Sequence, residues 1–114
     1  MNRDKKLFIE DILESIKNIE SFSKGTTKNK LSKDKLKQSA IIRQIEIIGE
    51  AVKNLPIDFI TKYPEVPWRY IAGMRDVITH SYFKLDLGKV WEVIKVDLPT
   101  LKQQIQKIKM DYKN

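Results

Sequence analysis

The sequence predicts an all-α fold, an up-and-down bundle of four main helices plus a short helix. Apolar residues recur at steps of three and four along most of the 114 residues, and no run alternates as a half-buried strand does. Hydrophobic residues make up 41% and charged residues 32% of the chain, which is typical of a globular protein. A chain of this length builds one core, so we expect a single domain over residues 1–114.

Two apolar stripes predict the first two long helices. The first covers about residues 4–23, and Gly25 ends it. Ser32 is the expected N-cap of the second, which runs to Leu55. Its isoleucines span more than one stripe, so we expect this helix to be central or to lie in a subunit interface. The stripes are formed by Phe8, Ile9, Ile12, Leu13, Ile16 and Ile19, and by Leu36, Ala40, Ile41, Ile45, Ile48, Val52 and Leu55.

Prolines mark the next helix starts. Pro56 is placed to open a short helix over Ile57–Lys62, and Pro67 to open a helix from Trp68 to about His80. Gly73 lies inside this last helix, where glycine costs about 1 kcal/mol relative to alanine. Its presence therefore predicts close packing or a backbone approach.

One more helix closes the predicted bundle. Asp86 is its expected cap, and its apolar residues run from Val90 to Ile108. Pro99 falls within this run and cannot donate a backbone hydrogen bond. The helix is therefore expected to kink or restart near Asp97.

Charge and cysteine content limit the compartment and the partners. The chain has 22 Lys and Arg against 15 Asp and Glu, which gives a net charge of +7. Residues 24–37 hold much of this excess, and their lysines are typical of either a solvated surface or a phosphate-binding face. Without cysteine the chain has no disulfide and no sulfur-based zinc site. No apolar segment resembles a signal peptide or a membrane span, so we expect a soluble, cytoplasmic protein with no membrane contact.

Candidate chemistry is concentrated in residues 73–83. If one helix continued through them, Arg75 and Tyr82 would lie within about 20° of each other and Arg75 and His80 about 140° apart. Arg75 and His80 therefore meet only if the helix ends or bends near His80, or if a second copy of the chain contributes. A lone histidine near a helix end is also often a structural cap.

The same residues suit RNA cleavage without a metal. That reaction needs a group to take the 2′-hydroxyl proton, a group to protonate the leaving 5′-oxygen, and a cation on the phosphoryl oxygens. His80 can perform either proton transfer and Arg75 can hold the phosphate. One histidine is too few for a metal site of His and Cys ligands, and the four glycines are too far apart for a phosphate loop. We therefore expect neither a metal nor a cofactor.

Arg75, His80 and Tyr82 form an R-x4-H-x-Y pattern that resembles the signature of the HepT class of HEPN-domain proteins, the toxin partners of minimal nucleotidyltransferases. The similarity covers nearly the whole chain and is weakest in the lysine-rich stretch at 24–37. The other similar segments are Ala40–Ala51, Tyr63–Trp68, Ile71–Asp76, Val90–Trp91 and Asp97–Pro99.

The resemblance implies a HEPN-type bundle that pairs as a homodimer, with the two Arg/His motifs in one cleft. It implies metal-independent endoribonuclease activity with Arg75 and His80 as catalytic residues. It further implies that a nucleotidyltransferase antitoxin silences the toxin by adding AMP to Tyr82. Asp76 is expected to orient Arg75 or to contact RNA.

The carboxylates of Glu46 and Glu50 have two open interpretations. Both match family positions and would support the catalytic cleft. They are equally typical of surface or interface carboxylates that pair with Arg43 or Lys53.

Two other functions compete with the RNase toxin. The first is a non-catalytic nucleotide- or RNA-binding accessory subunit of a nucleotidyltransferase, in which the same three residues hold a phosphate. The second is a basic helical DNA-binding protein, which is weaker because no helix-turn-helix spacing is present.

Overall fold

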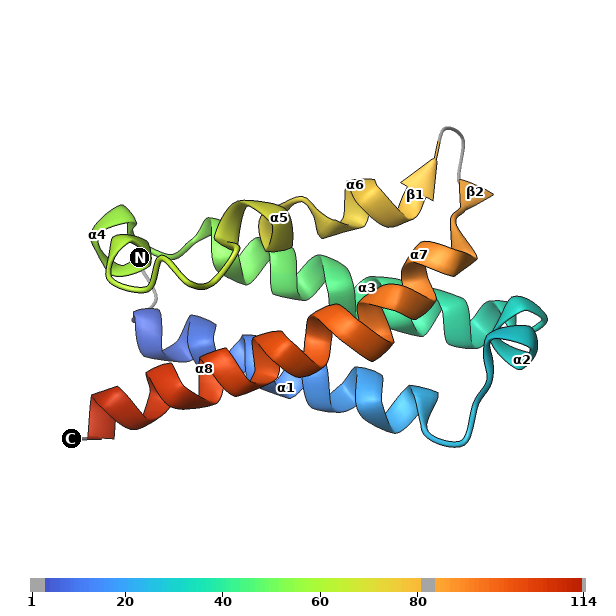
Figure 1. Cartoon of the computed structure of the whole chain (residues 1–114), viewed down its shortest axis with the longest axis horizontal. Coiled ribbons are helices and arrows are strands. Elements are labelled where there is room, and N and C mark those ends of the chain that lie inside the picture. The colour runs from blue at the N-terminus through green and yellow to red at the C-terminus, as the bar shows by residue number, and fades with distance from the viewer. Residues whose placement is uncertain (1–3, 81–83, 114) are drawn as a thin grey trace.

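The chain is an antiparallel helical bundle in the computed structural model, which describes residues 4–80 and 84–113 (Figure 1). Four passages run up and down the long axis: α1, α3, α5 with α6, and α7 continuing into α8. The short α2 and α4 lie at opposite ends. The helices are α1 (Lys5–Ser23), α2 (Lys28–Ser32), α3 (Lys35–Lys53), α4 (Ile57–Thr61), α5 (Trp68–Ala72), α6 (Met74–Ile78), α7 (Leu87–Glu92), the π-helix η1 (Val93–Asp97) and α8 (Leu98–Lys113); the strands are β1 (Thr79–His80) and β2 (Lys84–Leu85). The predicted all-α bundle is confirmed.

The lysine-rich stretch contains a short helix that the sequence analysis did not predict. It contains α2, whose N-cap Thr27 accepts a hydrogen bond from the backbone amide of Lys30. The prediction that Ser32 caps the central helix is wrong. Asp34 caps α3 instead, because its carboxylate accepts from the amide of Lys37 at 2.9 Å.

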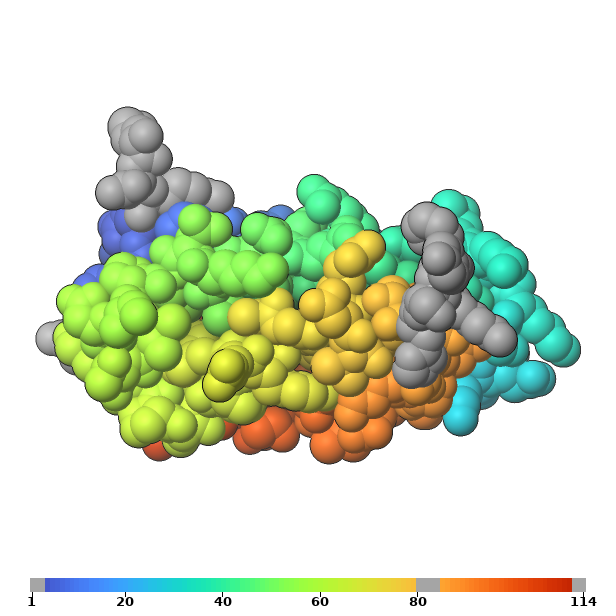
Figure 2. Space-filling view, turned by 90° about the horizontal axis from the view of Figure 1, so that it is seen from above, coloured from blue at the N-terminus to red at the C-terminus, as the bar shows by residue number. Residues whose placement is uncertain are grey.

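The predicted helix from Trp68 to His80 is broken twice. Gly73 separates α5 from α6, and its amide donates to the carbonyl of Arg69 at 3.2 Å. The second break follows Ile78, where the extended backbone of Thr79 (φ −111°, ψ 129°) begins β1. This end is stabilised by the amide of Asp86, which donates to the carbonyl of Ile78 at 2.8 Å. α4, α5 and α6 follow one another along the face seen in Figure 2.

The last passage changes its helical pitch where the sequence predicted a kink. Asp86 caps α7 by accepting from the amide of Lys89. The π-helix η1 ends at Asp97, and α8 follows directly. Pro99 explains the change. It has no amide hydrogen to donate to the carbonyl four residues earlier, and its ring would clash with that carbonyl in a regular α-helix.

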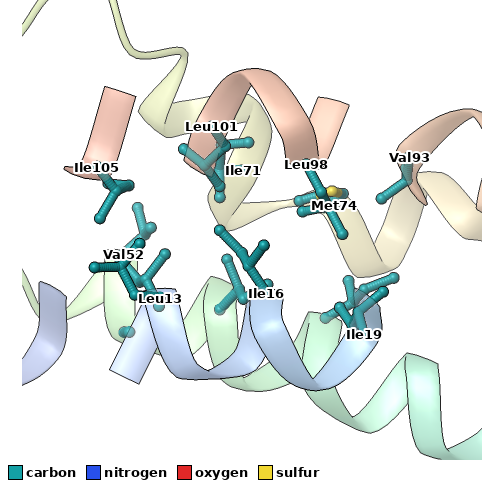
Figure 3. Close-up of a cluster of buried hydrophobic side chains, with 14 of the residues drawn as sticks. Leu13, Ile16, Ile19, Val52, Ile71, Met74, Val93, Leu98, Leu101 and Ile105 are labelled. Atoms are coloured by element: carbon teal, nitrogen blue, oxygen red, sulfur yellow. The ribbon is translucent and has the colours of Figure 1, made fainter. Parts of the chain in front are cut away.

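The core runs along the bundle between α1, α3 and α8, with α5 and α6 covering it (Figure 3). Isoleucines of α1 and α3 are its main components, including Ile16 at 1% and Ile48 at 0% exposure. The width of apolar surface on α3 is therefore used largely inside the monomer, and only Ile42 and Ile47 of its isoleucines remain half-buried. None of the helices in the described part is long and apolar enough to cross a membrane.

Tyr70 connects α5 to the π-helix η1. Its hydroxyl donates to Oδ2 of Asp97 at 2.6 Å, and Lys89 lies 5.7 Å from the centre of its ring. Burial, and then the hydrogen bond to Asp97, raise the pKa of Tyr70 above its ordinary value. The phenol therefore stays protonated and keeps this contact further into the alkaline range than a free tyrosine would.

Candidate functional site

Arg75 and Glu46 form the centre of the candidate site. Arg75 is the second residue of α6 and Glu46 lies near the middle of α3, and their ion pair joins Nε to Oε2 at 2.6 Å. The arginine side chain is 53% and the glutamate side chain 30% exposed, so the pair faces solvent. Because Nε carries only one of the five N–H groups of a guanidinium, this contact leaves the two terminal nitrogens to bind an anion.

A pocket of about 370 Å³ opens beside this pair, between α3 and the α5–α6 passage. We call it the Glu46 pocket. Cations and carboxylates line it in equal number. They are Arg43, Lys53 and Arg75 against Glu46, Glu50 and Asp76, with Ile45, Gly49, Ala72 and Gly73 completing the wall.

Both interpretations of Glu46 and Glu50 find support in the ion pairs. Glu50 pairs with Lys53 at 3.7 Å, as expected of neighbours on a helix surface. Glu46 pairs with Arg43 at 3.7 Å, but it also reaches across to Arg75. Of these two glutamates, Glu46 is therefore the one that joins α3 to the predicted motif through an ion pair between described residues.

Asp76 is exposed on α6 and lines the Glu46 pocket next to Arg75. It is therefore brought to the predicted site. The backbone of His80 belongs to β1 and pairs with Lys84 in the antiparallel ladder. The side chain of His80 lies outside what the structure describes. Tyr82 lies outside the described residues altogether. The end of α6 before His80 removes the helical geometry that kept His80 about 140° from Arg75.

The sequence analysis expected close packing or a backbone approach at Gly73, but the closer approach is at Gly49, where α3 meets α5. A Cβ atom on Gly49 would lie 3.1 Å from the carbonyl oxygen of Ala72, whereas one on Gly73 would meet nothing nearer than 3.7 Å. The sequence contained the signal, since Gly49 directly follows two isoleucines inside a long apolar helix. Its absent side chain brings the backbone just before α6 against α3, which sets the distance between Arg75 and Glu46.

A second pocket, of about 520 Å³, lies on the other side of Arg75. We call it the hairpin pocket because β1, β2 and the start of α7 form one wall and α2 with the first half of α3 the other. The sequence analysis did not identify it. Its described lining residues are Ser32, Lys35, Gln38, Ser39, Ile42, Arg75, Thr79, Leu85 and Leu87. Within the described residues, no group of three or more His, Asp or Glu side chains is arranged to hold a metal ion.

Comparison with known proteins places the sequence in a family. The model of the family described as "Ribonuclease HepT-like" matches residues 12–108. The chain is 44% identical over 109 residues to a protein of Thermococcus cleftensis named "Probable ribonuclease HepT". The aligned region covers 96% of this chain and 99% of that protein. No solved structure matches the chain.

Two proteins of Methanocaldococcus jannaschii are also similar. One, named "Putative RNase", is 43% identical over 96% of this chain and 90% of its own length. The other, named "Gamma-glutamylcyclotransferase and putative RNase", is 49% identical over 95% of this chain, which spans only 49% of that protein. The family match covers most of the chain and includes Arg75, His80 and Glu46. The chain therefore belongs to the HepT-like ribonuclease family.

Proposed function

We propose that this protein is a metal-independent endoribonuclease, the toxin of a HEPN–nucleotidyltransferase toxin–antitoxin pair. The proposal rests above all on the 2.6 Å ion pair that holds the solvent-facing guanidinium of Arg75 to α3, with His80 five residues further along the chain. Family membership supports RNA as the substrate. The positive charge of +7 favours a polyanion.

The proposed reaction divides the work between two side chains. The imidazole of His80 moves the proton between the 2′-hydroxyl and the leaving 5′-oxygen, since an imidazole titrates near neutral pH. The 2′-oxygen bonds to phosphorus as the bond to the 5′-oxygen breaks. Arg75 stabilises the negative charge that develops on the phosphoryl oxygens, and Glu46 keeps the guanidinium in position. Asp76 orients Arg75 or contacts the RNA.

The first test is cleavage of RNA by purified protein that carries no AMP. We expect cleavage at an unchanged rate in excess EDTA, because both proton transfer and charge stabilisation come from side chains. Loss of cleavage on chelation, restored by a divalent ion, would contradict the metal-independent mechanism. Binding of RNA without cleavage would instead favour the accessory-subunit function.

A homodimer is part of the proposal. The wide apolar surface of α3 that motivated it is largely buried within the monomer, as described above. Exposed apolar side chains that remain on α3 and α6 support it, namely Leu36 at 83% and Val77 at 36% exposure. Sedimentation velocity at micromolar concentration measures the assembly, and a monomer there would leave each Arg/His pair to act alone.

Control by the antitoxin is proposed to act through Tyr82. An AMP group on the phenol would bring a phosphodiester charge two residues from His80, where Arg75 binds it bidentately and RNA is excluded. We expect Tyr82→Phe to remain an active nuclease and to gain no AMP from the nucleotidyltransferase and ATP, as mass spectrometry would show. An inactive Tyr82→Phe would assign the phenol to catalysis. AMP on another residue of the wild type would show that the modification site is wrong.

A further inference from the structure

The two pockets that share Arg75 differ sharply in charge. The Glu46 pocket balances three cations with three carboxylates. Its ion pairs at 2.6 and 3.7 Å join Glu46 to Arg75 and Arg43, and Glu50 to Lys53. The hairpin pocket is lined by Lys35 and Arg75, and no carboxylate is among its described lining residues. A phosphodiester is repelled by the carboxylates of the first pocket and attracted by both cations of the second.

The hairpin pocket also has the mixed lining that a nucleotide requires. Ile42, Leu85 and Leu87 are half-buried and supply an apolar floor. Ser39 and Thr79 add hydroxyl groups to the wall. Apolar surface with a few polar groups is typical of sites that bind a base and sugar and orient them.

The wall formed by α2 and α3 is held in place by local contacts. The side-chain amide of Gln38 donates to the carbonyl of Leu31 at 2.8 Å and so fixes the junction between α2 and α3. Leu31 itself is 1% exposed and anchors α2 in the core. Lys35, in the first turn of α3, is therefore presented from a fixed backbone.

We propose that the hairpin pocket is a subsite for the nucleotide next to the scissile bond of the RNA. In this subsite Lys35 binds the phosphate adjacent to the one that Arg75 binds. This inference rests on the proposed ribonuclease function for its substrate. It assigns a role to the lysine-rich stretch at 24–37, the part of the chain least similar to the family pattern. The RNA then crosses α3 on the side of β1, and the Glu46 pocket remains outside its path. On this path Asp76, which lines the Glu46 pocket, orients Arg75 and does not contact the RNA.

Binding of a 2′-O-methyl RNA oligonucleotide, which cannot be cleaved, tests the subsite by fluorescence anisotropy. Lys35→Ala should weaken binding about fivefold and lower the slope of log affinity against log salt by about 0.7, the value for one phosphate contact with a single strand. Lys33→Ala is the matched control, since Lys33 is exposed in the same stretch but does not line the pocket. It should change affinity less than twofold.

A negative or a positive charge introduced at Ser39 tests the same pocket, because the two charges should change RNA affinity in opposite directions. Ser39 is exposed on α3, so both variants should fold. Ser39→Glu should weaken RNA binding about tenfold and Ser39→Lys should strengthen it severalfold, because the pocket places the new charge beside the phosphate. The same pair at Ser21, exposed on α1 outside both pockets, should have little effect.

The two hypotheses fail separately when cleavage of the unmodified RNA is measured beside this binding. If the wild type binds and cleaves RNA but Lys35 and Lys33 variants behave alike, the subsite is wrong and the nuclease stands. If the wild type binds RNA with the expected pattern of variants but never cleaves it, the subsite stands and the nuclease is wrong. If no RNA binds at all, the subsite is overturned as well.

Discussion

Replacing Arg75 with alanine is expected to lower kcat for RNA cleavage by at least 10²–10³-fold, about 3 kcal/mol or more, without unfolding the protein. The magnitude is that of removing one preorganised donor from the developing charge of a transition state. The side chain is 53% exposed and its partner is a solvent-facing carboxylate, so its removal costs the bundle little. Single-turnover cleavage of a labelled RNA measures the rate, and circular dichroism the fold.

The control for this variant is Arg69→Ala. Arg69 is exposed on α5, six residues before Arg75, and lines neither the Glu46 pocket nor the hairpin pocket. It should cleave RNA like the wild type. If Arg75→Ala retained full activity, or if both arginine variants lost activity equally, Arg75 would have no specific part in the chemistry.

His80→Ala separates proton transfer from charge stabilisation. Its loss should be 10²–10⁴-fold, about that of a removed general acid or base, and it should abolish the limb of the pH–rate profile near neutral pH. Arg75→Ala should keep that limb while lowering the whole profile. A His80→Ala protein that cleaves RNA with the wild-type pH profile would contradict the role of the imidazole.

Glu46 is a positioning residue in this mechanism, since it touches Arg75 and not the RNA. Glu46→Ala should lower kcat more than it raises KM, because the guanidinium still attracts phosphate but is no longer held. Glu46→Gln retains an oxygen that accepts from Nε of Arg75 and should recover part of the rate. A uniform loss of stability with unchanged kcat in both variants would reduce Glu46 to a structural ion pair.

The helices were predictable from the sequence because apolar periodicity and prolines dominate their energetics. The stripe on α1 is buried as expected, and the restart at η1 follows from the chemistry of a single residue, Pro99. The errors fell where two local signals compete. Ser32 and Asp34 are both good caps two residues apart, and the sequence does not reveal that α2 uses the stretch before Asp34.

The candidate site was predictable in its residues and only partly in its geometry. Arg75, His80 and Tyr82 follow from the motif. The end of α6 at Ile78 instead depends on the β1–β2 ladder, in which Thr79 pairs with Leu85. The ion pair of Arg75 with Glu46 crosses from α6 to α3 and has no sequence spacing of its own. The hairpin pocket combines residues of α2, α3, α6, β1, β2 and α7, so only the folded chain reveals it.

The contact between α3 and α5 provides the largest expected effect on stability. Gly49 is buried, and an added Cβ would lie 3.1 Å from the carbonyl oxygen of Ala72 and 3.6 Å from that of Ile71. Both neighbours are backbone atoms, which cannot rotate away as a side chain can. Gly49→Leu should therefore force α5 from α3 and lower the free energy of unfolding by about 3 kcal/mol or more, measured by urea denaturation.

The loss of stability at Gly49 should depend on the size of the added side chain. The same substitutions at Gly88 provide the control. Gly49→Ala should be nearly neutral, because the helix propensity gained, up to about 1 kcal/mol, offsets the tight Cβ contact. Gly88 is exposed in α7, where a Cβ would approach only the side-chain ends of Asp86 and Lys28, at 3.4 and 3.6 Å. Gly88→Ala and Gly88→Leu should both keep or slightly raise stability.

The same substitution should affect activity through the site it supports. Ala72 and Gly73 stand immediately before α6, so moving α5 away from α3 moves Arg75 away from Glu46. RNA cleavage by Gly49→Leu should therefore fall even at temperatures where the variant is folded, whereas cleavage by Gly49→Ala should stay within a few-fold of the wild type. A Gly49→Leu protein as stable and as active as the wild type would show that α3 and α5 do not need this close approach, and that the distance from Glu46 to Arg75 is set elsewhere.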